Sequence, residues 1–154
     1  VWIDCRGEQP AIDLAFLRTL PALNSVGIAG GAWRVLDLEP LRGLPLRSVT
    51  LVRQHLAAVD LSAIAQPALT HLMLQDLEIR ADYMDLSPLV VCKDLQFLSL
   101  LSAEVGTLDV SGIAKLARLA RFDAPNFKSM TMAPSFAPIV SPGLLRWKDN
   151  IGVE

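Results

Sequence analysis

Five aspartates recur along the chain at a nearly constant spacing and are its most regular polar feature. Each stands between two apolar residues, and successive aspartates are 24, 23, 25 and 24 positions apart: Asp13, Asp37, Asp60, Asp85 and Asp109. Aspartate ladders bind calcium in some β-solenoids, but those proteins carry glycine-rich nonapeptides that this chain lacks. Aspartate also caps short helical turns by accepting hydrogen bonds from backbone N–H groups. We therefore expect each aspartate to cap the turn that follows it, and we expect no metal site.

The other residue types that support catalysis occur without partners at useful spacings. His55 and His71 are the only histidines, and neither has a Cys or His at metal-ligand spacing or lies in a G-x-S-x-G motif. Gly30-Gly31 follows a predicted strand, as a phosphate loop would, but the Lys-Ser/Thr pair and the long helix of such a loop are missing. The sequence therefore predicts no enzyme and no cofactor.

The two cysteines, Cys5 and Cys92, are too few for a disulfide framework. If the chain stacks with the period of its aspartates, they lie more than three repeats apart, well beyond the ~7 Å between Cα atoms that a disulfide spans. Free thiols favour a reducing compartment, which points to the cytoplasm.

Composition excludes two further classes of protein. The net charge is −2 and no dense basic stripe appears, so the chain lacks the electrostatic character of a nucleic-acid binder. Hydrophobic residues make up 52 % of the chain, but acidic, basic or proline residues interrupt every apolar run, and no membrane span is expected.

A second motif has the same period as the aspartates, and its apolar spacing is typical of a strand. The first residues of its five copies are 23, 23, 26 and 24 positions apart. The copies are Leu23-x-x-Val26-x-Ile28, Leu46-x-x-Val49-x-Leu51, Leu69-x-x-Leu72-x-Leu74, Leu95-x-x-Leu98-x-Leu100 and Leu119-x-x-Phe122-x-Ala124. Partial copies stand at Val1-x-Ile3 and at Leu144-x-x-Trp147-x-Asp149. Two motifs that share one period predict stacked coils rather than a globule with one central core.

Each predicted coil runs through a strand, a loop, a corner at the aspartate and one short helical turn. A proline two or three places after an acidic residue, as in Asp37-Leu-Glu-Pro40 and Asp85-Leu-Ser-Pro88, is a start signal for that turn. The coil that begins at Leu69 is two residues longer between strand and aspartate. The extra length falls within residues 76–83 and is interpreted either as drift in a loop or as a bulge on the binding side.

With these motifs the chain resembles the leucine-rich repeat family, whose signature is the L-x-x-L-x-L strand. The segment Asp85-Leu-Ser-Pro-Leu89 followed by Leu95-x-x-Leu98 is similar to the bacterial internalin-like class. The resemblance implies an α/β solenoid over residues 1–154, with about six to seven coils of ~24 residues. It implies a parallel β-sheet on one face, with short helical turns and loops on the other. Residues before Val1 are expected, either as an N-terminal cap or as part of a larger protein.

One feature departs from the family pattern, which places an Asn three positions after the last apolar strand residue. The corresponding residues here are Gly31, Gln54, Leu77, Ala103 and Phe127. Because the Asn ladder satisfies backbone groups at the exit from the strand, its absence predicts exit loops that differ from coil to coil.

The residues between the apolar strand positions are expected to face outward on one side of the sheet. In the middle coils several of them are apolar, and polar residues surround them, which is the composition of a protein-binding patch. The predicted binding residues are Val52, Arg53, His71, Met73, Gln75, Phe97, Ser99, Leu101 and Arg121.

The leading functional hypothesis is a non-catalytic module that binds a protein partner through this strand face. Two alternatives remain open: an inhibitor or immunity-type protein that blocks a toxin or enzyme, and a structural repeat segment of a larger multidomain protein whose other parts cover the patch.

Overall fold

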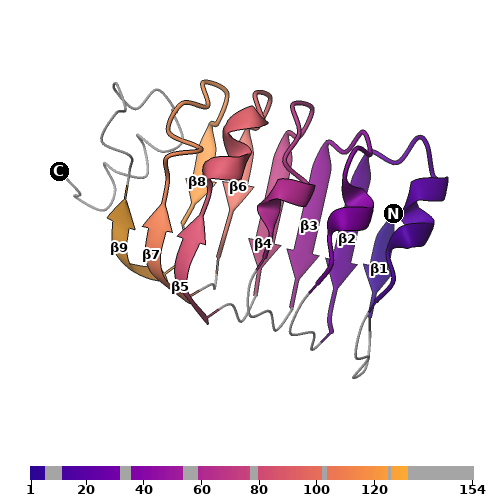
Figure 1. Ribbon diagram of the computed structural model, residues 1–154, viewed down its shortest axis with the longest axis horizontal. Coiled ribbons are helices and arrows are strands. Elements are labelled where there is room, and N and C mark those ends of the chain that lie inside the picture. The colour runs from indigo at the N-terminus through magenta and orange to yellow at the C-terminus, as the bar shows by residue number, and fades with distance from the viewer. Residues whose placement is uncertain are drawn as a thin grey trace.

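The molecule is a small α/β protein built on parallel strands (Figure 1). The computed structural model describes residues 1–5, 12–31, 36–53, 59–76, 80–101, 104–124 and 126–131. Six strands form one sheet in the order β1-β2-β3-β4-β6-β8, and three form a second sheet in the order β5-β7-β9. The first sheet consists of β1 (Trp2–Asp4), β2 (Ser25–Ala29), β3 (Ser48–Val52), β4 (His71–Gln75), β6 (Phe97–Ser99) and β8 (Arg121–Asp123). The second sheet consists of β5 (Arg80–Asp85), β7 (Glu104–Asp109) and β9 (Asn126–Thr131).

Four short 3-10 helices complete the described elements: η1 (Ala15–Thr19), η2 (Glu39–Leu41), η3 (Leu61–Ala63) and η4 (Ser87–Val91). η2 and η4 each contain a proline in their first two positions, which supplies a backbone angle suited to a helical start. Consecutive 3-10 helices contact one another, so the helical turns, like the strands, pack in chain order.

The strands pair so that equivalent positions of the sequence motif lie side by side. Val26 pairs with Val49, Val49 with Leu72, and Leu72 with Leu98, which in turn pairs with Phe122. All five of these side chains are at most 4 % exposed. The first apolar position of each motif is also buried, which confirms the predicted core positions: Leu23, Leu46, Leu69, Leu95 and Leu119. The parallel sheet and the in-register stacking of the motif follow the sequence prediction.

The second sheet is a departure from the prediction, which has loops at the residues of β5 and β7. Met84 and Leu108 pair across it and are buried, but Gly106 interrupts the alternation of apolar residues that would have marked β7 as a strand. A Cβ atom at Gly106 would lie 2.5 Å from the carbonyl oxygen of Asp82, so only glycine allows the two strands this approach. The longer segment before Asp85 therefore contributes residues 80–85 to a strand.

The predicted capping role of the aspartate ladder is confirmed. In every copy the carboxylate accepts a hydrogen bond from the backbone N–H two residues later, at 2.7–2.9 Å. The acceptors are Asp13, Asp37, Asp60, Asp85 and Asp109. Met130-Thr131, which has threonine in place of the aspartate, pairs in register with Leu108-Asp109.

These caps give the fold an acid-sensitive component. Hydrogen bonds from Ser62 lower the pKa of Asp60 below its usual range. Burial raises the pKa of Asp109, but hydrogen bonds from Ser111 and Tyr83 outweigh it and the pKa is lowered. A carboxyl group whose pKa is lower in the folded state stabilises the fold above its unfolded pKa, and this stabilisation is lost as the pH falls through the folded pKa.

We therefore expect the free energy of unfolding to decrease as the pH falls from about 5 to about 3. Asp60→Asn keeps a side-chain oxygen for the turn but removes the titrating group, so it should flatten this decrease, and Asp109→Asn should do the same. Urea unfolding at a series of pH values measures the effect. An unchanged slope in both variants would rule out the caps as its source.

The exits from β2, β3 and β4 are alike at their first residue, whereas Cys5, Leu100 and Ala124, which directly follow β1, β6 and β8, have no positive φ. Gly30, Arg53 and Asp76 each follow a strand directly, and each has a positive φ, of 75°, 57° and 51°. Gln54, Leu77 and Ala103 lie outside the described residues, so the predicted variation in the later part of these loops stays a prediction. Phe127 lies within β9.

Both cysteines are free. Within the described parts of the chain, no helix is long and apolar enough to cross a membrane. The partial motif copy at residues 144–149 and His55 lie outside the described residues.

Candidate functional site

The six-stranded sheet presents one face of alternating side chains opposite the buried ones, and we call this surface the strand face. Strand pairing arranges it in rows. One row contains Ser25, Ser48, His71, Phe97 and Arg121; the next contains Trp2, Gly27, Thr50, Met73, Ser99 and Asp123; a third contains Asp4, Ala29, Val52 and Gln75. All predicted binding residues except Arg53 and Leu101 therefore belong to three neighbouring rows of one surface.

Phe97 is the central aromatic side chain of the first row, and its two neighbours contact it. The guanidinium carbon of Arg121 lies 5.3 Å from the centre of the Phe97 ring, which is a cation–π contact. On the other side, the His71 and Phe97 ring centres are 6.1 Å apart, with the planes tilted by 32°. Phe97 is half-buried between them. Its orientation is thus set by the protein itself.

Both flanking side chains are held in place by hydrogen bonds. The Arg121 Nε donates to both carboxylate oxygens of Asp123, at 3.0 and 3.1 Å, and this pairing raises the pKa of Arg121. The Nδ1 of His71 lies 2.9 Å from the Thr70 hydroxyl, which donates to the carbonyl oxygen of Arg47 at 2.8 Å. The side chains of this row are therefore held in fixed positions, and such preorganisation lowers the entropic cost of binding at a protein surface.

The other predicted binding residues differ in accessibility. Arg53, His71 and Arg121 are exposed, Leu101 is 41 % exposed, and Val52, Met73, Gln75 and Phe97 are half-buried. Leu101 lies two residues beyond the end of β6, so it extends the surface past the paired rows.

Ser99 differs from the expectation of an outward, accessible residue, because it is fully buried. It lies between Met73 and Asp123 in the second row, and its hydroxyl has no hydrogen-bond partner among the described residues. A small side chain between two larger neighbours loses its access to solvent, and strand alternation alone does not reveal this. Ser99 is therefore not an accessible contact residue in this structure.

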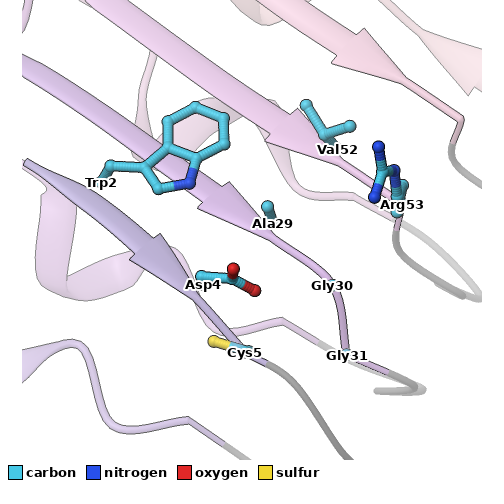
Figure 2. A pocket seen from close by; sticks show the side chains of 8 residues that line it. All are labelled: Trp2, Asp4, Cys5, Ala29, Gly30, Gly31, Val52 and Arg53. Carbon is cyan, nitrogen blue, oxygen red and sulfur yellow. The ribbon is translucent and has the colours of Figure 1, made fainter.

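A hollow of about 520 Å³ opens where β1, β2 and β3 end (Figure 2). Its lining consists of Trp2, Asp4, Cys5, Ala29, Gly30, Gly31, Val52 and Arg53. Val52 and Arg53 belong to the predicted binding residues, so the hollow continues the strand face. Trp2 is not among the predicted binding residues. Its 60 % exposure, unusual for so large an aromatic side chain, is the structural signal that adds it.

The position of the Trp2 ring depends on Gly27, its pairing partner on β2. A Cβ atom at Gly27 would lie only 2.0 Å from Cε3 of the Trp2 ring, so the ring occupies space that any other residue would fill. Figure 2 shows the indole projecting across β2 toward the side of the hollow formed by Val52. This aromatic–glycine pair forms one wall of the hollow.

The thiols have environments that keep them protonated. Burial, together with the neighbouring charge of Asp4, raises the pKa of Cys5, and burial raises the pKa of Cys92 to about 11. Since the thiolate is the reactive form of cysteine, neither environment activates a nucleophile. Among the described residues, no three His, Cys, Asp or Glu side chains lie close enough to hold a metal ion.

No known protein family and no curated protein matches the chain at a significant level.

Proposed function

We propose that the chain is a leucine-rich repeat protein, an α/β solenoid of about six to seven coils of ~24 residues, that binds a protein partner through its strand face. In this proposal it is a non-catalytic interaction module without a cofactor, and nucleic acid is not its ligand. Support for the repeat architecture comes from the register, in which equivalent motif positions pair across β2, β3, β4, β6 and β8.

The observation that carries the binding function is the first row of the strand face, in which Phe97 lies between His71 and Arg121. We call it the Phe97 row. Aromatic and arginine side chains supply much of the binding energy at protein interfaces, especially where their geometry is fixed before binding. Phe97 and Arg121 meet this description, since each is held by its neighbours. Met73 extends the apolar surface from the adjacent row, and His71 and Gln75 provide a polar rim.

The charges of this surface favour a partner that is not strongly charged. Arg121 is paired with Asp123 at 3.0 Å, and the lining of the hollow includes one acidic and one basic side chain, Asp4 and Arg53. A nucleic acid would need several unpaired basic side chains in a row. An apolar protein surface with a few polar groups is the better match.

Hydroxyl-radical footprinting of the protein with and without its partner tests the proposal. We expect binding to protect Met73 and Phe97 from oxidation at least about threefold, because a partner removes them from water. Phe16 on η1 and Tyr83 on β5 are 49 % and 53 % exposed, and as controls away from the strand face they should oxidise equally in both states. Protection of Phe16 and Tyr83 without protection of Met73 and Phe97 would place the interface elsewhere.

A further inference from the structure

Arg53 occupies a backbone position that does not suit its residue type. Three consecutive strands are each followed directly by a residue with left-handed backbone angles: Gly30 after β2, Arg53 after β3 and Asp76 after β4. Glycine adopts these angles without strain, and aspartate is enriched there, whereas a long side chain is disfavoured. The structure fixes the position, since the Arg53 N–H donates to the carbonyl oxygen of Gln75 at 3.1 Å.

No contact with a described residue gives the Arg53 side chain a stabilising role that would account for an arginine at this position. Its guanidinium makes no ion pair or hydrogen bond with a described residue, and the side chain is exposed. It does line the hollow at the ends of β1 to β3 (Figure 2). Residues with strained backbone angles cluster at functional sites. The strain at Arg53 therefore indicates a function for its side chain in the hollow.

We propose that Arg53 binds an acidic side chain of the protein partner, whose neighbouring apolar side chain enters the hollow between Trp2 and Val52. This inference rests on the proposed function and adds the chemistry of the partner segment. A carboxylate matches the planar fork of an arginine, which donates two parallel hydrogen bonds to it. Trp2 and Val52 give the apolar neighbour of that carboxylate a surface to cover.

The position of Asp4 sets the direction in which the segment binds. Asp4 pairs with Ala29 and Ala29 with Val52, so Asp4 and Arg53 lie on opposite walls with β2 between them. Two strand spacings separate these walls by about 10 Å. The acidic group therefore binds on the β3 side, away from Asp4, and the apolar side chain lies toward β1.

NMR titration with short peptides tests the proposal directly. The probe is acetyl-Leu-Glu-amide, followed through the Nε–H signal of Arg53 and the indole N–H signal of Trp2. We expect both signals to shift in a saturable manner. The neutral analogue acetyl-Leu-Gln-amide should bind about tenfold more weakly, because it lacks the charge-assisted pair. Acetyl-Leu-Lys-amide should not shift the Arg53 signal.

Two variants at left-handed positions provide a matched pair. Arg53→Gly removes the guanidinium and the strain together, so it should abolish the preference for Glu over Gln while the thermal midpoint stays equal or rises. Asp76→Gly makes the same change one strand further along, at a residue that does not line the hollow. It should leave peptide binding within about twofold of the original protein.

The results separate this inference from the proposed function. Equal binding of the Glu and Gln peptides, or tighter binding of the Lys peptide, would overturn the assignment of Arg53 but leave the Phe97 row untouched. A Glu preference that persists in Arg53→Gly would overturn it as well. If footprinting places the partner elsewhere while the Glu peptide still depends on Arg53, the hollow stands as a site and the proposed interface fails.

Discussion

Replacing Leu98 with alanine is expected to lower the free energy of unfolding by about 2–5 kcal/mol, the range observed for large-to-small substitutions in packed cores. Leu98 is fully buried and lies between Leu72 and Phe122 in the central column of the core. Its removal opens a cavity at the junction of three strands. Neighbours held in register by backbone pairing cannot collapse to fill such a cavity.

Urea unfolding at constant pH measures this loss. Leu101→Ala is the matched control, because Leu101 lies three residues away on the same segment but is 41 % exposed. It should cost less than about 1 kcal/mol. A loss below about 1 kcal/mol for Leu98→Ala would mean that the column of motif residues does not form the core.

The sequence was sufficient for features that depend on residue type and period. The period of the Leu-x-x-Leu-x-Leu motif predicted that its copies stack, since each apolar position needs an equivalent neighbour to be buried, and the family resemblance implied the parallel sheet. The aspartate ladder was equally predictable, because an Asp with Ser or Glu-Pro beginning two residues later has a specific local hydrogen-bonding preference. Both features are local, and each repeats often enough to stand out from chance.

Structural features that depend on neighbouring residues in the next sequence repeat could not be predicted from the sequence. Gly106 concealed β7, because its meaning lies in the close approach of Asp82 on β5. The hollow depends on Gly27 making room for Trp2, two residues that meet only after β1 and β2 pair. Ser99 is buried by the sizes of its row neighbours. In each case the deciding contact joins residues some 24 positions apart, and hydrophobic periodicity does not encode it.

Replacing Phe97 and Met73 together with aspartate is the second substitution for which we expect a large effect. Phe97 packs against His71 and under Arg121, and Met73 lies diagonally beside it on the next row. Two carboxylates would remove the apolar area and introduce charges that the partner must desolvate. Loss of an interface aromatic alone costs about 2–4 kcal/mol, so a weakening of binding of at least about 100-fold is expected.

The fold should tolerate this double substitution, because neither side chain belongs to the buried core. Val90→Asp with Val91→Asp is a control of equal charge change on η4, where the two side chains are 38 % and 42 % exposed. Both double variants should unfold cooperatively near the midpoint of the original protein. This separates an effect on binding from an effect on folding.

The most direct measurement of the strand-face claim is the ratio of two dissociation constants for the same purified partner, one for Met73→Asp/Phe97→Asp and one for Val90→Asp/Val91→Asp. Isothermal titration calorimetry on the two folded variants provides both values. We predict a ratio of at least about 100, with the Val90/Val91 variant within about threefold of the original protein. A ratio near one, or a loss of binding confined to the Val90/Val91 variant, would contradict the claim that the strand face binds the partner.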